Sequence, residues 1–120
     1  MALIHLSVLP LKRAEEAYAL VRLGTGWSEH DWFEWMRPSE GERRGVLSAT
    51  ALGGVLLGLA AYVVKGRTLD VPLFVAFELG GRGETRDALR NGLDQVGERL
   101  GCDRVCFSDE SRGLVETATG

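Results

Sequence analysis

The segment Leu79–Thr85, with sequence LGGRGET, is the part of this chain whose residue types and spacing could do chemistry. It follows an apolar stretch and leads directly into a helical pattern. Unpaired backbone amides and the dipole at a helix start favour an anion, and glycine lets a phosphate approach the main chain closely. Arg82 adds a positive charge. The sequence therefore predicts a phosphate-binding turn, and an ordinary turn without a ligand is the alternative.

Known nucleotide motifs fit this turn poorly. A dinucleotide fingerprint needs glycine or alanine where Arg86 stands, and no lysine followed by serine or threonine completes a P-loop. A Rossmann fold is therefore not predicted.

The elements around the turn indicate a strand, a helix and a second strand. Residues 69–79 alternate, with Leu69, Val71, Leu73 and Val75 on one side, which predicts an interior strand. Proline cannot donate to a sheet ladder, so Pro72 within this strand suggests a β-bulge. Apolar residues at helical spacing predict a helix over 84–100. Residues 102–108 follow as a strand parallel to the first, because a helix of suitable length joins the two.

The first half of the chain predicts a strand at 4–8, helices at 11–23 and 28–37, and a hairpin over 45–64. This last segment is uncharged and long enough for a membrane span. The Gly53-Gly54 pair in its middle and its β-branched residues favour a β-hairpin instead. Together the elements predict an α+β fold, a mixed sheet flanked by helices.

Composition narrows the classes of protein. The chain has 120 residues, 45% of them hydrophobic, which predicts a single domain over 1–120. A net charge of -3 gives no general field for nucleic acid. Two cysteines, Cys102 and Cys106, are too few for a disulfide scaffold or a four-ligand zinc site, and only two histidines could help them. No metal is therefore predicted, and the thiols are expected free in the core. Because the start lacks the order of a signal peptide, a cytoplasmic location is expected.

Three tryptophans, Trp27, Trp32 and Trp35, lie close together in and before the second helix. They could wall an acceptor pocket or cover a partner. Aromatic rings at helical spacing usually serve the core, so we expect two of them to pack on the sheet and one to shield a helix end.

The order of elements resembles the GNAT acetyltransferase superfamily: a strand, two helices, a hairpin, a long strand, the glycine turn, a helix and a strand. In that family the turn's amides bind the pyrophosphate of coenzyme A, and a bulge in the preceding strand exposes an amide to the thioester carbonyl. The resemblance implies that acetyl-CoA or another acyl-CoA is the cosubstrate. The residues assigned to its binding are Leu79, Gly80, Gly81, Arg82, Gly83, Glu84 and Thr85.

The sequence departs from the family pattern in two ways. Of the pyrophosphate signature, only Gly83 is kept, since Gly80 and Thr85 stand where the family has arginine or glutamine and a small residue. The resemblance covers about residues 3–108, after which the family continues with a further helix and two strands. We expect a second subunit to supply the missing sheet edge, which predicts a homodimer.

Transfer to an amine requires a base, and Asp70 and Glu78 on the less apolar side of the long strand are the candidates. Charged residues at strand ends are also often only solvated. The resemblance thus implies an acyl-CoA-dependent N-acetyltransferase acting on an unidentified amine, either a small molecule or a protein. The alternative is a catalytically silent module for protein interaction or self-association.

Overall fold

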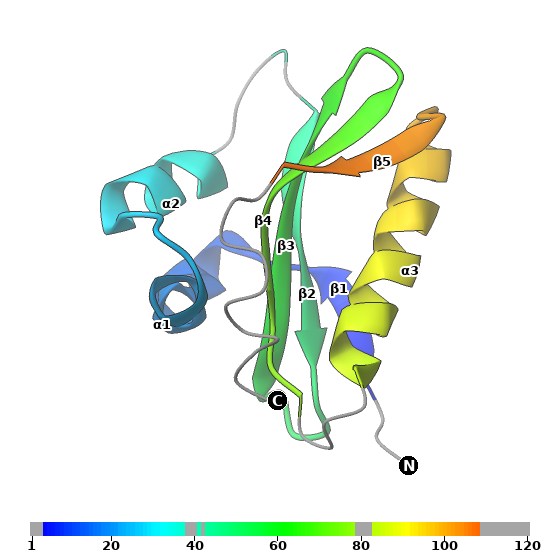
Figure 1. The fold of residues 1–120 in the computed structure, drawn as a ribbon. Coiled ribbons are helices and arrows are strands. Elements are labelled where there is room, and N and C mark those ends of the chain that lie inside the picture. Colours follow the sequence, from blue (N-terminus) through cyan, green and yellow to red (C-terminus); the bar gives the residue numbers. More distant parts are fainter. Residues whose placement is uncertain (1–3, 38–40, 42, 79–82, 109–120) are drawn as a thin grey trace.

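In the computed structural model, residues 4–37, 41, 43–78 and 83–108 are described, and these form a five-stranded mixed sheet with helices on both sides (Figure 1). The sheet order is β1-β2-β3-β4-β5, antiparallel throughout except for the parallel pair β4–β5. The predicted α+β class is confirmed. The elements are β1 (His5–Val8), η1 (Leu11–Arg13), α1 (Ala14–Gly24), α2 (Glu29–Met36), β2 (Arg44–Thr50), β3 (Leu56–Lys65), β4 (Thr68–Ala76), α3 (Glu84–Arg99) and β5 (Arg104–Phe107).

The uncharged segment 45–64 forms the predicted hairpin rather than a helix. β2 and β3 pair along their length, and Gly53 and Gly54 turn the chain with φ of +92° and +85°. Glycine suits this turn because other residues rarely adopt positive φ. Within the described residues, no helix is long and apolar enough to cross a membrane.

The sheet separates two cores, with α1 and α2 on one side and α3 on the other (Figure 1). Trp32 is the largest fully buried side chain, and it lies in the core under α1 and α2. Leu89 and Leu93 of α3 fill the opposite core. These apolar contacts fix where α3 begins relative to the strands.

A β-bulge in β4 corrects the predicted faces of that strand. Between the pairs Ala61–Leu73 and Val63–Asp70 the register shifts, so that Val71 and Pro72 both stand opposite Tyr62. Leu69 and Val71 consequently pack on the α3 side, whereas Leu73 and Val75 pack on the α1–α2 side. The apolar alternation of the sequence is continuous here, but the extra residue of the bulge moves the apolar side chains that follow it to the other face of the sheet.

The two cysteines differ from expectation in burial. Both are free, as predicted, but Cys106 is exposed and Cys102 only half-buried. β5 is the edge strand of the described sheet and most of its residues are exposed, so Cys106 lies outside the core.

Candidate functional site

The strands β4 and β5 form a fork whose branching point is the bulge. They pair from Thr68–Arg104 to Val71–Phe107, and the amide of Ser108 adds a 3.0 Å bond to the Val71 carbonyl. β4 then continues from Pro72 to Ala76, and no described strand pairs with this part on the β5 side. Pro72 fits this position because it has no amide to donate. The bulge that Pro72 suggested is therefore confirmed.

An aromatic pair lies at the fork. The rings of Phe74 on β4 and Phe107 on β5 meet edge to face with centroids 5.4 Å apart. The guanidinium of Arg90 on α3 lies 5.0 Å from the centre of the Phe107 ring. An aromatic ring from each strand and the guanidinium of α3 thus meet at the fork.

Helix α3 begins beside the unpaired half of β4. Gly58 on β3 pairs with Ala76 near the end of β4, and a Cβ at Gly58 would lie 2.8 Å from Leu89 Cδ1 and 3.1 Å from Thr85 Cγ2. Glycine is required here because a larger residue would push the first turns of α3 off the sheet. The helix start is thereby held at the open end of the fork.

The predicted turn is described only in part. Leu79, Gly80, Gly81 and Arg82 lie outside the described residues. Gly83 is the N-cap of α3, with φ of +76° and no side chain to cap the helix. Glu84 is exposed, whereas the side chain of Thr85 is buried against β3. The backbone amide of Thr85 donates a hydrogen bond to the Glu78 side chain.

Glu78 supplies the missing cap. Its Oε1 accepts a 2.8 Å hydrogen bond from the Thr85 amide, and its Oε2 accepts a 3.0 Å bond from the Arg86 amide. Two amides at the positive end of a helix attract a carboxylate and hold it in position. Chemically, the carboxylate acts here as an anion ligand of the helix start.

Asp70 lies elsewhere, next to the bulge and on the opposite face of the sheet from Leu69 and Val71. Its side chain is 14% exposed; one carboxylate oxygen lies 3.6 Å from Lys65 Nζ and accepts a 3.2 Å hydrogen bond from Ser108 Oγ. The structure does not bring Asp70 and Glu78 together. Only Asp70 stands at the branching point of the fork.

Tyr62 is the ionisable side chain opposite the bulge, on the α3 side of the sheet. Burial raises the pKa of its phenol, and the positive charge of Arg99 opposes that effect. The phenol is therefore kept neutral over an extended alkaline range.

The tryptophans divide between core and cavity. Trp32 is fully buried and donates from Nε1 to the Ala14 carbonyl at 2.8 Å, whereas Trp27 and Trp35 are half-buried and meet edge to face at 5.6 Å. The latter two line a cavity of about 300 Å³ with two carboxylates and an arginine. The other lining residues are Asp31, Glu34 and Arg44.

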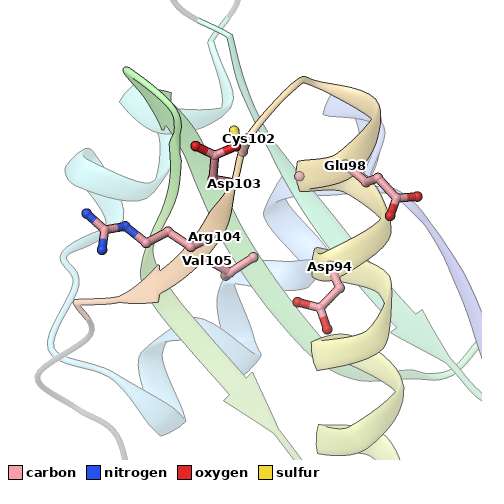
Figure 2. Close-up of a pocket in the computed structure, with 7 residues that line it drawn as sticks. Asp94, Glu98, Cys102, Asp103, Arg104 and Val105 are labelled. Atoms are coloured by element: carbon pink, nitrogen blue, oxygen red, sulfur yellow. The ribbon is translucent and has the colours of Figure 1, made fainter.

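A second cavity, of about 250 Å³, lies at the other end of α3. Figure 2 shows Asp94 and Glu98 projecting from α3, with Cys102, Asp103, Arg104 and Val105 along the chain into β5. Asp103 is engaged in a bidentate bond to Arg67, with distances of 2.7 and 2.8 Å. Among the described residues no group of three histidine, cysteine or acidic side chains is placed to hold a metal ion.

Arg86 and Arg90 are further candidate site residues, which the sequence analysis did not single out. They are one turn apart on α3 and so share a face of the helix, and Arg86 Nη2 lies 3.0 Å from where a Cβ of Gly83 would be. The signal was present, since two arginines at a spacing of four directly follow the glycine turn. The capping role of Glu78 had no such local signal.

Comparison with known proteins identifies the fold. No family model and no curated protein matches the sequence. Among solved structures, the ribosomal-protein-alanine N-acetyltransferase of Brucella melitensis biovar Abortus 2308 superposes with a TM-score of 0.70 at 17% identity, over 98% of this chain and 91% of that chain. The aminoglycoside 6'-N-acetyltransferase AAC(6')-Ih of Acinetobacter baumannii gives 0.73 at 10% identity, over 96% and 85%.

A further neighbour was solved with a ligand: the aminoglycoside N-acetyltransferase AAC(6')-Iy in complex with coenzyme A superposes with a TM-score of 0.70 at 15% identity, over 100% of this chain and 88% of that chain. The bulge in β4 and the helix that begins after the glycine turn are features that the resemblance implied. The chain therefore has the fold of the GNAT acetyltransferase superfamily.

Proposed function

We propose that this chain binds an acyl-CoA at the fork and transfers its acyl group to an amine. The observation that carries the proposal is the bulge at Val71–Pro72, where β5 parts from β4 and leaves a fork at whose open end α3 begins. Arg90 at the fork and Arg86 at the helix start suit the phosphates of such a ligand. An acyl-CoA supplies an activated acyl group in its thioester.

In the proposed reaction the amine nitrogen attacks the thioester carbonyl carbon, and the carbon–sulfur bond breaks to release the thiolate of coenzyme A, which takes a proton from solvent. The nitrogen loses a proton as the new carbon–nitrogen bond forms. Asp70 is our candidate to accept it, because its partly exposed carboxylate is at the branching point. Glu78 is a poorer base, since both of its oxygens are engaged by amides.

The cavity beside Trp27 and Trp35 is our candidate for contacts with the amine acceptor. Its aromatic walls and the carboxylates of Asp31 and Glu34 suit an ammonium group, and it lies on the α1–α2 side of the sheet, which Asp70 also faces. Trp35 bonds the Gly45 carbonyl, and Gly45 pairs with Tyr62 opposite the bulge. The acceptor would then approach from the face opposite α3.

The first experiment is isothermal titration of the purified protein with acetyl-CoA, with ADP as the control ligand. We expect acetyl-CoA to bind with a Kd in the micromolar range, which is a binding free energy of about -8 kcal/mol, and ADP to bind more weakly. Gly83→Val should abolish binding, because a branched side chain crowds the helix start and strains a positive φ. Gly101→Val is the matched control, since Gly101 has φ of +82° at the other end of α3. Equal loss in both variants would remove the turn from the site.

The second experiment tests Asp70 by the release of thiol from acetyl-CoA in the presence of an amine panel. Asp70→Asn should lower turnover about 100-fold, the lower end of the usual contribution of a general base, and leave acetyl-CoA affinity intact. Unchanged turnover would exclude Asp70 as the base. Circular dichroism shows whether the variant is folded.

One observation favours the alternative, a catalytically silent module for protein interaction or self-association. The two amides at the helix start are already bound by Glu78, which leaves fewer donors for a phosphate. This alternative predicts no heat with millimolar acetyl-CoA, together with a dimer by light scattering. A monomer that binds acetyl-CoA would exclude it.

A further inference from the structure

The start of α3 differs from an ordinary helix start in the origin of its cap. A helix leaves its first amides without partners, and the side chain of the N-cap residue usually accepts from the second or third of them. Gly83 has no side chain to do so. The two amides are instead bound by Glu78, five residues before the cap and beyond the end of β4.

The geometry of this contact uses the whole carboxylate. Oε1 faces the Thr85 amide at 2.8 Å and Oε2 faces the Arg86 amide at 3.0 Å, so each oxygen has one donor. A phosphate bound at the helix start would need the same donors. Two anions cannot share them, because each amide has a single hydrogen and like charges repel at this distance.

Features other than the helix end also point to an anionic ligand here. Arg90 is exposed and its guanidinium lies over Phe107 at the fork, and the guanidinium of the half-buried Arg86 lies against Gly83, one turn earlier on the same face. A neighbour of the same fold was solved in complex with coenzyme A. The cations and the fold thus bring an anionic ligand to the place where Glu78 is bound.

We infer that Glu78 is an internal competitor of the acyl-CoA, an autoinhibitory contact that the ligand must displace from the amides of Thr85 and Arg86. The inference rests on the proposed function. It implies that the wild-type chain binds acyl-CoA more weakly than the same site would without the Glu78 contact. It also implies that the displaced Glu78 carboxylate is released from the helix start when the ligand binds.

The test compares Glu78→Gln with Asp87→Asn in titrations with acetyl-CoA. Both changes remove one negative charge near the start of α3, but Asp87 is exposed, and among the described contacts its carboxylate accepts no hydrogen bond from the amides of the helix start. We expect Glu78→Gln to tighten binding at least 10-fold, because an amide side chain has one acceptor oxygen in place of two and carries no charge. Asp87→Asn should tighten it less than 3-fold.

The outcomes separate this inference from the proposed function. If the wild type binds acetyl-CoA and Glu78→Gln leaves its affinity unchanged or lowers it, the inference is overturned and the proposed function stands. Equal gains in both variants would also overturn it, since charge alone would then explain them. Binding only by Glu78→Gln would support the inference and show that the wild type is silent. Absence of binding in all three proteins would overturn both.

A second measurement does not depend on a variant. In the wild type, nuclear magnetic resonance should follow the Thr85 and Arg86 amides and the Glu78 carboxyl carbon during the acetyl-CoA titration. Displacement predicts that all three signals shift together with one saturation curve. A ligand that shifts other amides and leaves these three unmoved would overturn the inference.

Discussion

The helices α2 and α3 begin in different ways. α2 is capped from within, because the Ser28 hydroxyl accepts a 3.1 Å bond from the Asp31 amide three residues on. α3 begins at a glycine and is capped by Glu78 from beyond the end of another element. A cap within the helix is part of its folding, whereas a remote cap can be exchanged for a ligand without unwinding the helix. The comparison explains why only α3 is our candidate for binding.

Trp32→Ala should have the largest effect, because it removes the anchor of α2. The side chain is fully buried and its indole nitrogen bonds the Ala14 carbonyl. We expect the free energy of unfolding to fall by about 3–5 kcal/mol, measured by urea denaturation. Trp32→Phe should lose less, since it keeps most of the volume. Equal losses would show that the indole hydrogen bond matters more than packing.

Gly58→Ala tests the corresponding anchor of α3, which is a close approach rather than a large side chain. The added Cβ would lie 2.7 Å from the Val75 carbonyl oxygen, a backbone atom that cannot move aside cheaply. We expect a loss of about 1–3 kcal/mol in the free energy of unfolding. Gly26→Ala is the control, because a Cβ at Gly26 has no atom within 4 Å. A neutral Gly58→Ala would show that α3 can shift on the sheet.

Ser28→Ala breaks the local cap and should cost about 1 kcal/mol of stability. Its expected effect on acetyl-CoA affinity is nil, because α2 and α3 lie on opposite sides of the sheet (Figure 1). Ser28→Asp should restore the cap and most of the stability. The comparison between the two helices fails if Ser28→Ala changes the affinity as much as Glu78→Gln does.

The same difference explains what could be predicted from the sequence. Ser28 and Asp31 are three positions apart, the hairpin turns at Gly53-Gly54, and the parallel pair β4–β5 follows from a helix of suitable length between two strand patterns. Pro72 indicated the bulge, but alternation alone could not show that the bulge turns β4 over. Glu78 could not be recognised as a cap, because a helix is usually capped by its N-cap residue, and Glu78 stands five residues before Gly83.

The smallest expected effect concerns the α3 side of the sheet, which buries the phenol of Tyr62. Burial raises its pKa above the unfolded value near 10, so the neutral form is favoured in the folded state. The contribution of the neutral Tyr62 phenol to the free energy of unfolding is present in full below about pH 10. It is lost as pH rises through the higher folded pKa, because the charged phenolate must then be buried. We therefore expect the urea midpoint of the wild type to fall more steeply above pH 10 than that of Tyr62→Phe. Other groups titrate in both proteins, so the difference between the two curves isolates Tyr62. Parallel curves would mean that the phenolate reaches solvent or Arg99 without cost, and that the α3 side of the sheet is more open at the bulge than its packing indicates.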